Sequence, residues 1–247
     1  MREAITVSGM VLAASPVGEY DKRVVILTRE LGKITAFARG ARRMKSPLMA
    51  VSNPFVFGEF QVYEGRDSYT LSGANIKEYF LDLAQMQPGV YYGFYFLELA
   101  EYFGQEGNDE TQMLNLLYVT MNAIRRGKQD LRLIRCIFEL RTITISGEAP
   151  QMFSCMECGT KENLTVFSLR DSAIYCPNCG KTIRDPWPLQ PATVLACRYI
   201  IAAPLAKLYG FTVNEEILDE LERLLRAYLH HYVEKKMKTL QILDVMK

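Results

Sequence analysis

The sequence predicts a multidomain α+β protein, in which an N-terminal five-stranded β-barrel is followed by an all-α domain with an embedded four-cysteine knuckle. Three observations lead to this prediction. The first 80 residues hold short apolar segments separated by turn residues, the later positions show helical spacing, and two cysteine pairs interrupt the helical part. We therefore expect a barrel domain over residues 1–80 and a helical domain over 81–247, with the knuckle at 151–184.

Five strands account for the predicted barrel. Apolar and polar residues alternate in them, as in strands that bury one face, and turn residues separate them. The expected strands are residues 5–13, 22–28, 32–39, 55–65 and 68–76. Alternation along the third strand gives one small apolar face and one cationic face with an aromatic ring. The apolar face holds Ile34, Ala36 and Ala38, and the other holds Lys33, Thr35, Phe37 and Arg39.

The helical domain begins where the spacing of apolar residues changes after Pro88. Asn108 or Asp109 can cap a second helix, and Gly127 is suited to end it. A third helix follows and is closed by Pro150. The remaining helical stretches are residues 191–210 and 214–247.

Four cysteines form the most specific motif of the chain. They stand as two C-x2-C pairs separated by 17 residues, the spacing of a zinc site: Cys155, Cys158, Cys176 and Cys179. Four thiolates fill a tetrahedral shell and leave no position for an activated water, so we expect one structural Zn²⁺ ion. A glycine follows each pair and permits the tight turn in which backbone amides approach sulfur. The residues between the pairs are expected to form a short hairpin.

Other interpretations of the cysteines stay open. The two pairs could be redox-active, or they could be a metal-free relic of a zinc site. They could also form a disulfide framework, although such frameworks are rare in cytosolic chains with CxxC doublets. Cys136 and Cys197 lie in apolar helical contexts, and we interpret both as core residues.

Charge is unevenly distributed along the chain, although the net charge is only +1. Residues 22–45 hold eight basic residues and one acid, whereas residues 59–110 hold ten acids and two basic residues. Because binding follows local potential, the first segment suits a phosphate backbone, with a mobile basic loop after the cationic strand. Phe37 could then stack on an unpaired base. The alternative is a solvated surface with Phe37 in the barrel core.

A second basic cluster lies in the helical region. Its members are Arg125, Arg126, Lys128, Arg132 and Arg135. The cluster could extend a nucleic-acid path or simply line a helix, and we favour the second interpretation.

Motifs of enzymes are missing from the sequence. There is no H-E-x-x-H or G-x-S-x-G, and the Gly-Lys-Thr triplet at 180–182 lacks the glycine that a phosphate loop needs at Tyr175. His230 and His231 are adjacent on a helix and point about 100° apart, so a solvated pair is expected. We therefore predict that the protein is not an enzyme and has no small-molecule substrate, although plentiful acids leave an acid/base enzyme open.

Hydropathy gives no sign of a membrane protein. No stretch approaches the roughly 18 uninterrupted apolar residues of a membrane span. The first residues resemble a strand more than a signal peptide. We expect a cytoplasmic protein without a membrane partner.

Several segments of the chain resemble the RecO family, the bacterial recombination mediators of DNA repair. They are residues 21–28, 32–43, 54–60, the two CxxCG pairs and 236–243. The resemblance implies an OB-fold barrel, a helical domain with a zinc knuckle, and binding of single- and double-stranded DNA. It also implies annealing of complementary strands and, with RecR, loading of RecA onto DNA coated by single-stranded-DNA-binding protein. Thr239 stands where the family has a serine, so the hydroxyl group is kept.

The resemblance assigns roles to residues and names partners. The residues expected to contact DNA are Arg23, Lys33, Phe37, Arg39, Arg42, Arg43 and Lys45. The implied partners are RecR and the C-terminal tail of single-stranded-DNA-binding protein, with RecF as a further candidate, and the implied location during repair is the nucleoid. No residue is assigned to the pocket for that tail.

Three hypotheses about function follow. The first is a non-catalytic recombination mediator. The second is a zinc-stabilised protein-interaction adaptor with incidental DNA affinity, which the acidic residues 59–110 would suit. The third is a nuclease, which would need a cluster of carboxylates around a divalent metal ion.

Overall fold

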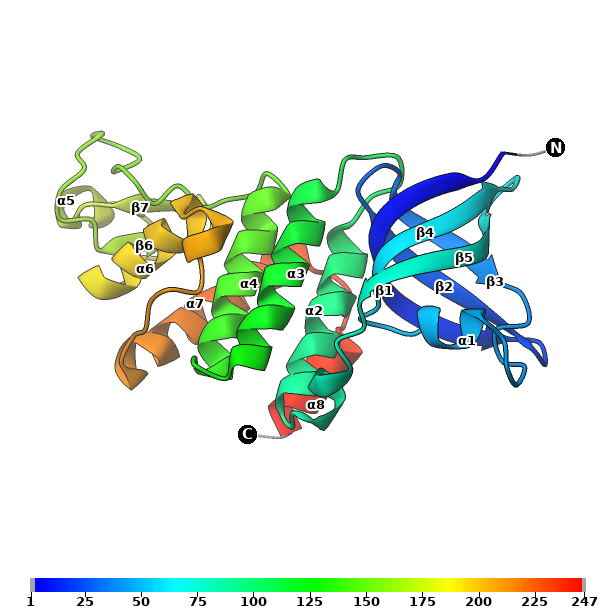
Figure 1. The fold of residues 1–247 in the computed structure, drawn as a ribbon. Coiled ribbons are helices and arrows are strands. Elements are labelled where there is room, and N and C mark those ends of the chain that lie inside the picture. Colours follow the sequence, from blue (N-terminus) through cyan, green and yellow to red (C-terminus); the bar gives the residue numbers. More distant parts are fainter. Residues whose placement is uncertain (1–2, 246–247) are drawn as a thin grey trace. The chain divides into compact units, whose positions relative to one another are not determined.

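The computed structural model describes residues 3–245 and separates the chain into two compact units (Figure 1). The first unit combines the chain up to Arg125 with the C-terminal segment from Met237, and the second runs from Arg126 to Lys236. Internal packing defines these units. The domain boundary at residue 80 rests instead on a change of secondary structure, and it stays a prediction. The outer limits of the expected domains, residues 1–2 and 246–247, lie outside the described residues.

The first unit contains a closed five-stranded β-barrel, which confirms the predicted OB-like fold. Its strands are β1 (Ile5–Val17), β2 (Asp21–Thr28), β3 (Gly32–Ala38), β4 (Phe57–Glu64) and β5 (Tyr69–Glu78). Around the barrel the order is β1-β2-β3-β5-β4. All neighbouring strands are antiparallel except β3 and β5, which run parallel. A short helix, α1 (Leu48–Val51), follows β3 in the chain.

The barrel core follows from alternation along the strands. Every second residue of β3 is buried, and those buried include the predicted apolar face, Ile34, Ala36 and Ala38. These side chains pack in one cluster with Val7, Val24 and Phe60. Small side chains suit this strand because a small barrel is filled by its own side chains and has little interior space.

Helices pack against the outside of the barrel within the first unit. After β5 come η1 (Leu81–Gln85), α2 (Gly89–Phe103) and α3 (Thr111–Arg126). Helix α2 packs against β1 and β2, which explains why all of residues 24–28 are buried although alternate side chains face away from the core. Asp109 caps α3, because its carboxylate accepts a hydrogen bond of 2.9 Å from the Thr111 backbone N–H. Hydrogen bonds from the Thr111 hydroxyl group and from its backbone N–H lower the pKa of Asp109.

The second unit combines helices with the cysteine insert. The helices are α4 (Leu131–Ile145), α6 (Pro191–Ala202), α7 (Glu215–Tyr232), the short α5 (Pro177–Gly180) and η2 (Leu205–Lys207). The insert contains the predicted hairpin, β6 (Val166–Ser168) with β7 (Ala173–Tyr175), and β6 also pairs with β8 (Trp187–Pro188). Helix α4 packs against α6 and α7. Among residues 3–245, no helix has both the length and the hydropathy of a membrane span.

The last helix, α8 (Lys238–Val245), belongs to the first unit and lies beside α2 (Figure 1). The prediction of continuous helix from residue 214 is therefore wrong, since the chain is non-helical between α7 and α8. The Glu98 carboxylate on α2 explains why a new helix starts at Lys238. It accepts hydrogen bonds from the backbone N–H groups of Lys238 and Thr239 and, at 2.5 Å, from the Thr239 hydroxyl group. A carboxylate at a helix N-terminus is favoured by the free N–H groups there.

The Thr239 hydroxyl group gives a first test of this anchor. We expect Thr239→Val to lower the free energy of unfolding by about 1–2 kcal/mol, because a charge-assisted hydrogen bond to Glu98 is lost. Thr239→Ser keeps the hydroxyl group and is the matched control. Equal stability of the valine and serine variants in urea unfolding would contradict the proposed anchor.

Candidate nucleic-acid interface and metal centre

The basic loop (residues 39–45) continues directly from β3 and carries four cations and an exposed methionine. Gly40 has a φ of +67°, which suits glycine, and the Ala41 side chain is fully buried and holds the loop on the barrel. The side chains before Gly40 and after Ala41 point outward. The exposed side chains are Arg39, Arg42, Arg43, Met44 and Lys45.

The basic loop is braced against the β1–β2 turn (residues 18–20). The Arg42 backbone N–H donates to the carbonyl of Tyr20 at 2.8 Å, and the Arg42 guanidinium donates to the carbonyl of Gly18 at 3.2 Å. The Arg43 guanidinium lies over the Tyr20 ring, 4.8 Å from its centre. Asp21 accepts a hydrogen bond of 2.7 Å from the Gly40 N–H. These bonds give the basic loop a defined turn, and the expected mobility of the loop stays a prediction.

Phe37 lies on the outer surface of the barrel and is half-buried, so the alternative that placed it in the core is wrong. Its cross-strand neighbour on β2 is Arg23, which is exposed. The Arg23 guanidinium donates to the Thr35 hydroxyl group at 3.3 Å. Arg23 and Phe37 thus form adjacent parts of one surface.

Lys33 lies at the other end of β3 from the basic loop. Arg39 comes six positions later in the chain, a distance of about 20 Å along an extended strand. The Lys33 ammonium donates a hydrogen bond of 2.8 Å to the carbonyl of Glu101 in the last turn of α2. A cation is favourable at a helix C-terminus, so this lysine has a structural contact. Its role in contacting DNA stays a prediction.

A short segment after α2 pairs with the beginning of β3. The Lys33 backbone N–H donates to the carbonyl of Gln105 at 2.8 Å, and the Gly107 N–H donates to the carbonyl of Leu31 at 3.0 Å. Gly32 lies between these bonds with a φ of +68°, and a Cβ atom there would lie 2.2 Å from the Gln105 oxygen. Only glycine fits this position.

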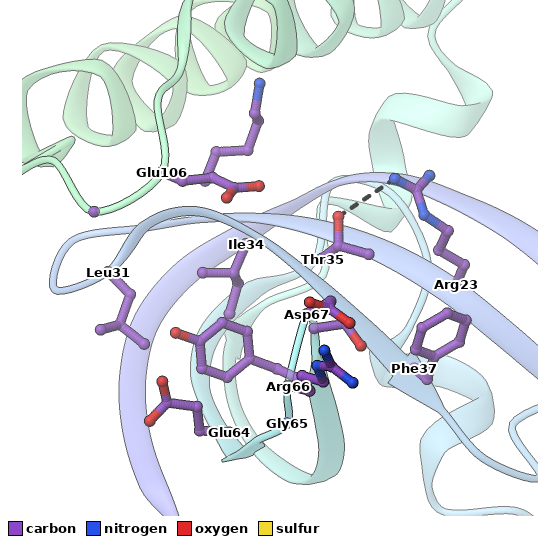
Figure 2. Close-up of a pocket in the computed structure, with 14 residues that line it drawn as sticks. Arg23, Leu31, Ile34, Thr35, Phe37, Glu64, Gly65, Arg66, Asp67 and Glu106 are labelled. Atoms are coloured by element: carbon purple, nitrogen blue, oxygen red, sulfur yellow. Dashed lines mark hydrogen bonds between the residues drawn. The ribbon is translucent and has the colours of Figure 1, made fainter.

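A groove of about 590 Å³ lies along the outer surface of β3 (Figure 2). It is lined by the outer residues of β2 and β3, by the β4–β5 turn (residues 65–68) and by the segment after α2. In Figure 2 the side chains of Arg66 and Asp67 extend from this turn toward Thr35 and Phe37 on β3. The ionic side chains that line the groove are Arg23, Lys33, Arg66, Glu64, Asp67 and Glu106.

Several groove residues were missed by the sequence reasoning. The sequence predicts only a turn between the fourth and fifth strands, yet the turn between β4 and β5 is a usual ligand-binding loop of a barrel of this type. That rule would have pointed to Arg66 and Asp67. No local sequence pattern predicts that Glu106 lines the groove, because its position depends on pairing with β3, a strand far away in the sequence.

The four cysteines of the second unit lie close together. The sulfur atoms of Cys155, Cys158, Cys176 and Cys179 all lie within 4.8 Å of one another. The sulfur atoms of Cys158 and Cys176 are 3.9 Å apart, close to the separation of about 3.8 Å that tetrahedral metal–sulfur bonds of about 2.3 Å require. A disulfide would need about 2.05 Å. The four-cysteine cluster therefore has the geometry to hold one metal ion.

The pKa values of two cysteines of the cluster are shifted in opposite directions. Burial alone would raise the pKa of Cys155, but backbone N–H groups of Cys158, Cys176 and Glu157 donate to its sulfur and bring the pKa to about 6. The hydrogen bond to Cys176 and burial raise the pKa of Cys179 to about 12. Four sulfur atoms this close would all ionise only with a cation between them.

The two glycines after the cysteine pairs act differently. Gly159 has a φ of +74°, as the predicted tight turn requires, and its N–H donates to the carbonyl of Cys155 at 2.9 Å. Gly180 is helical instead, and a Cβ atom there would lie 2.8 Å from the Val166 side chain. Close packing on β6 is therefore the reason for the second glycine. The adjacent Thr182 hydroxyl group bonds to the carbonyl of Cys179 at 2.7 Å, so this triplet belongs to the knuckle.

The remaining cysteines and the histidines lie where the sequence predicts. Cys136 and Cys197 are buried in the core of the second unit. Burial raises the pKa of the Cys197 thiol to about 12, which makes it a poor nucleophile. His230 and His231 are exposed at the end of α7.

The second basic cluster is mostly engaged in ion pairs. In the first unit, Arg125 pairs with Glu78 and Asp82. In the second unit, Arg132 on α4 pairs with three carboxylates of α7: Glu215, Asp219 and Glu222. Arg135 is only 2% exposed and donates to Glu222 at 2.6 Å. Arg126 at the end of α3 and Lys128 between α3 and α4 are exposed, and the interpretation of these two residues stays a prediction.

Comparison with known proteins gives a consistent result. The family described as "Recombination protein O N terminal" matches residues 1–80, and "Recombination protein O C terminal" matches residues 89–241. DNA repair protein RecO of Alkaliphilus metalliredigens is 32% identical over 232 residues, which covers 94% of this chain and 94% of the relative. DNA repair protein RecO of Bacillus subtilis is 28% identical over 244 residues, covering 97% and 93% respectively.

The ion pairs of Arg132 lead to a prediction about stability. We expect Arg132→Gln to lower the free energy of unfolding by about 1–3 kcal/mol, because it leaves the buried Glu222 carboxylate short of donors. Arg126→Gln removes an exposed cation of the same cluster and should change stability by less than about 0.5 kcal/mol. Urea unfolding measures both variants. An Arg132 variant as stable as the Arg126 control would contradict a structural role for these pairs.

Proposed function

This chain belongs to the recombination protein O (RecO) family of DNA repair proteins, and from that premise we propose that it is a non-catalytic mediator of recombination. In this proposal it binds single- and double-stranded DNA and anneals complementary strands. With RecR, it helps RecA to load onto single-stranded DNA coated by single-stranded-DNA-binding protein. The family match supports the repair role, and the geometry of the barrel surface supports the DNA-binding role.

The basic loop is the observation that carries the proposal. It presents four exposed cations, Arg39, Arg42, Arg43 and Lys45, on a backbone that hydrogen bonds already hold in place. A pre-ordered cationic surface loses little conformational freedom when it meets DNA. Its contacts with phosphates release counterions and do not depend on base sequence. We infer that Arg23, which is exposed on the neighbouring β2, extends this phosphate-binding surface.

Annealing follows from the same charges. Two complementary strands repel each other through their phosphates, and cations bound to each strand reduce that repulsion. Base pairing then supplies the free energy, so no nucleotide hydrolysis is needed for this step. DNA-stimulated ATP hydrolysis by the pure protein would count against this mechanism.

The partners in this proposal come from the family. They are RecR, the C-terminal tail of single-stranded-DNA-binding protein and, as a further candidate, RecF. A cytoplasmic protein that associates with the nucleoid during repair would meet all of them. A pull-down with each purified partner tests these contacts separately.

We infer that the four-cysteine cluster holds one structural Zn²⁺ ion. Four sulfur ligands in tetrahedral arrangement favour zinc, and a filled shell leaves no position for a substrate. When bound, zinc supplies only folding free energy here. The cysteines would fix the hairpin of β6 and β7 to the turn at Gly159.

The DNA-binding surface can be tested by charge reversal. We expect the change of Arg39, Arg42 and Arg43 to Glu to abolish most binding of labelled single-stranded DNA in fluorescence anisotropy. The slope of log affinity against log salt should become less steep by about 2, because each lost phosphate contact removes about 0.7.

The matched control changes three exposed cations of the second unit to Glu: Arg184, Lys207 and Arg223. It alters the net charge equally and should leave the salt slope unchanged. Equal weakening by both triple changes would point to net charge alone. Weak binding that neither change affects would favour the protein-interaction adaptor. DNA cleavage in the presence of magnesium would favour the nuclease.

The metal proposal is tested by Cys176→Ser. We expect the zinc content to fall below one ion per chain and the melting temperature to fall by about 10 °C or more, with DNA binding lost only as a consequence of unfolding. The control Cys136→Ala should keep one zinc ion per chain. Loss of DNA binding at an unchanged melting temperature would show that the knuckle acts on DNA directly.

A further inference from the structure

We propose that the outer face of α6 is a self-association surface, on which a second copy of this chain binds in antiparallel orientation about a two-fold axis. Helix α6 belongs to the second unit (Figure 1). The inference goes beyond the proposed function and does not depend on DNA, since none of these residues is assigned to DNA or to the metal. Four exposed side chains form the outer face: Ala192, Leu195, Tyr199 and Ala202.

Helix α6 is apolar on both of its faces. Its inner face packs in the core of the second unit and includes Val194, Cys197 and Ile200. A helix at the surface of a soluble protein normally carries charged or polar side chains on the opposite face, but the outer face of α6 carries no charge. Helix α7 of the same unit follows the usual rule, because its exposed positions include Glu216, Asp219, Arg223 and Arg226.

The outer face is ordered as well as exposed. Leu195, near its centre, is 62% exposed. The Tyr199 hydroxyl group donates to the carbonyl of Lys207 at 2.6 Å, and the Tyr199 ring lies edge-on to that of Phe211, with 4.9 Å between the ring centres. These contacts hold the Tyr199 side chain in place, so a partner can bind without the entropic cost of ordering it. Exposed apolar patches of this kind mark interaction sites.

The one charged residue of α6 lies beside the outer face. Arg198 donates to the carbonyl of Met152 at 2.6 Å, which ties its guanidinium to the knuckle. Phe153 follows Met152 in the chain and is 44% exposed, so the apolar surface extends onto the knuckle. A partner that brought charged groups to the outer face would lose their hydration without gaining an ion pair. An uncharged apolar surface is therefore the partner that fits, and the outer face of a second copy is such a surface.

The symmetry of the outer face points to a second copy. Its members follow one another after three, four and three residues, and at 100° per residue all lie within an arc of about 80°. This spacing is the same in both directions along the helix. A two-fold axis between Leu195 and Tyr199 therefore places each of these side chains against the other one of the second copy. At both ends Ala192 meets Ala202, and these small side chains let the helices approach closely. Two-fold dimers form through self-complementary faces of this kind.

The size of the outer face limits the strength of the dimer. Helix α6 has 12 residues and is about 18 Å long. Stable complexes bury about 800 Å² on each partner and use about 20–30 residues a side, which is more than α6 and its apolar neighbours supply. We therefore expect a reversible dimer with a dissociation constant above about 1 μM.

Sedimentation velocity of the full chain without DNA tests the dimer over concentrations from about 1 to 500 μM, the range of weak association. The wild-type protein should shift from monomer to dimer as the concentration rises. Leu195→Ala should weaken association by about tenfold or more, because each dimer loses two central contacts. The matched control is Leu81→Ala, which truncates a leucine of the first unit that is 74% exposed and should leave association unchanged.

A charge exchange tests the antiparallel pairing. The double variant Ala192→Lys with Ala202→Lys would bring like charges together at both ends of the dimer, and Ala192→Glu with Ala202→Glu would do the same with the opposite sign. Each double variant alone should remain monomeric. An equimolar mixture of the two should dimerise, because the lysines of one copy then face the glutamates of the other. Both positions are exposed on a helix, so the variants should keep the fold.

The outcomes are distinguishable. A wild-type protein that is monomeric at every concentration would overturn the inference and leave the outer face to a different protein partner. A dimer that Leu195→Ala and both double variants leave unchanged would place self-association on another surface and also overturn it. Failure of the mixture to dimerise would overturn the two-fold pairing. Loss of DNA binding in a protein that still dimerises would overturn only the proposed function.

Discussion

Closure of the barrel by β3 and β5 is the constraint on which the candidate DNA site depends. These strands run parallel and pair only at Ala36 with Tyr69 and at Phe37 with Thr70. The pairing sets the register of two segments more than thirty residues apart. It brings the β4–β5 turn beside the outer face of β3 and so forms one wall of the groove. It also ends early enough to let β3 continue into the basic loop.

Cations of this protein have two different roles, and the structure distinguishes them by their partners. Arg132 and Arg135 meet carboxylates of α7 and stabilise the second unit. Arg42 and Arg43 use their contacts with the β1–β2 turn to hold a geometry while their charges stay exposed. Local charge density is therefore a poor guide to binding unless the acids that compensate it are also known. In the groove, three cations and three carboxylates balance.

The sequence predicted the features that depend on local pattern. Strand alternation, helical spacing and the cysteine spacing all repeat over a few residues, so the barrel, the helices and the four-cysteine cluster could be recognised. Other features depend on distant partners that leave no local pattern. The Lys33 ammonium contacts Glu101, 68 residues away, and Thr239 contacts Glu98, 141 residues away. Neither the structural role of Lys33 nor the break before α8 could be predicted for that reason.

The return of α8 to the first unit has a consequence for how the protein is made. The barrel strands and α2 leave the ribosome before the second unit, but the helix that packs against α2 is synthesised only after the second unit. The surface of α2 that α8 covers is exposed throughout translation of the second unit. The first unit therefore cannot complete its fold in the usual N-terminal-first order, and its maturation waits until α8, which follows the whole second unit in the chain, has been synthesised.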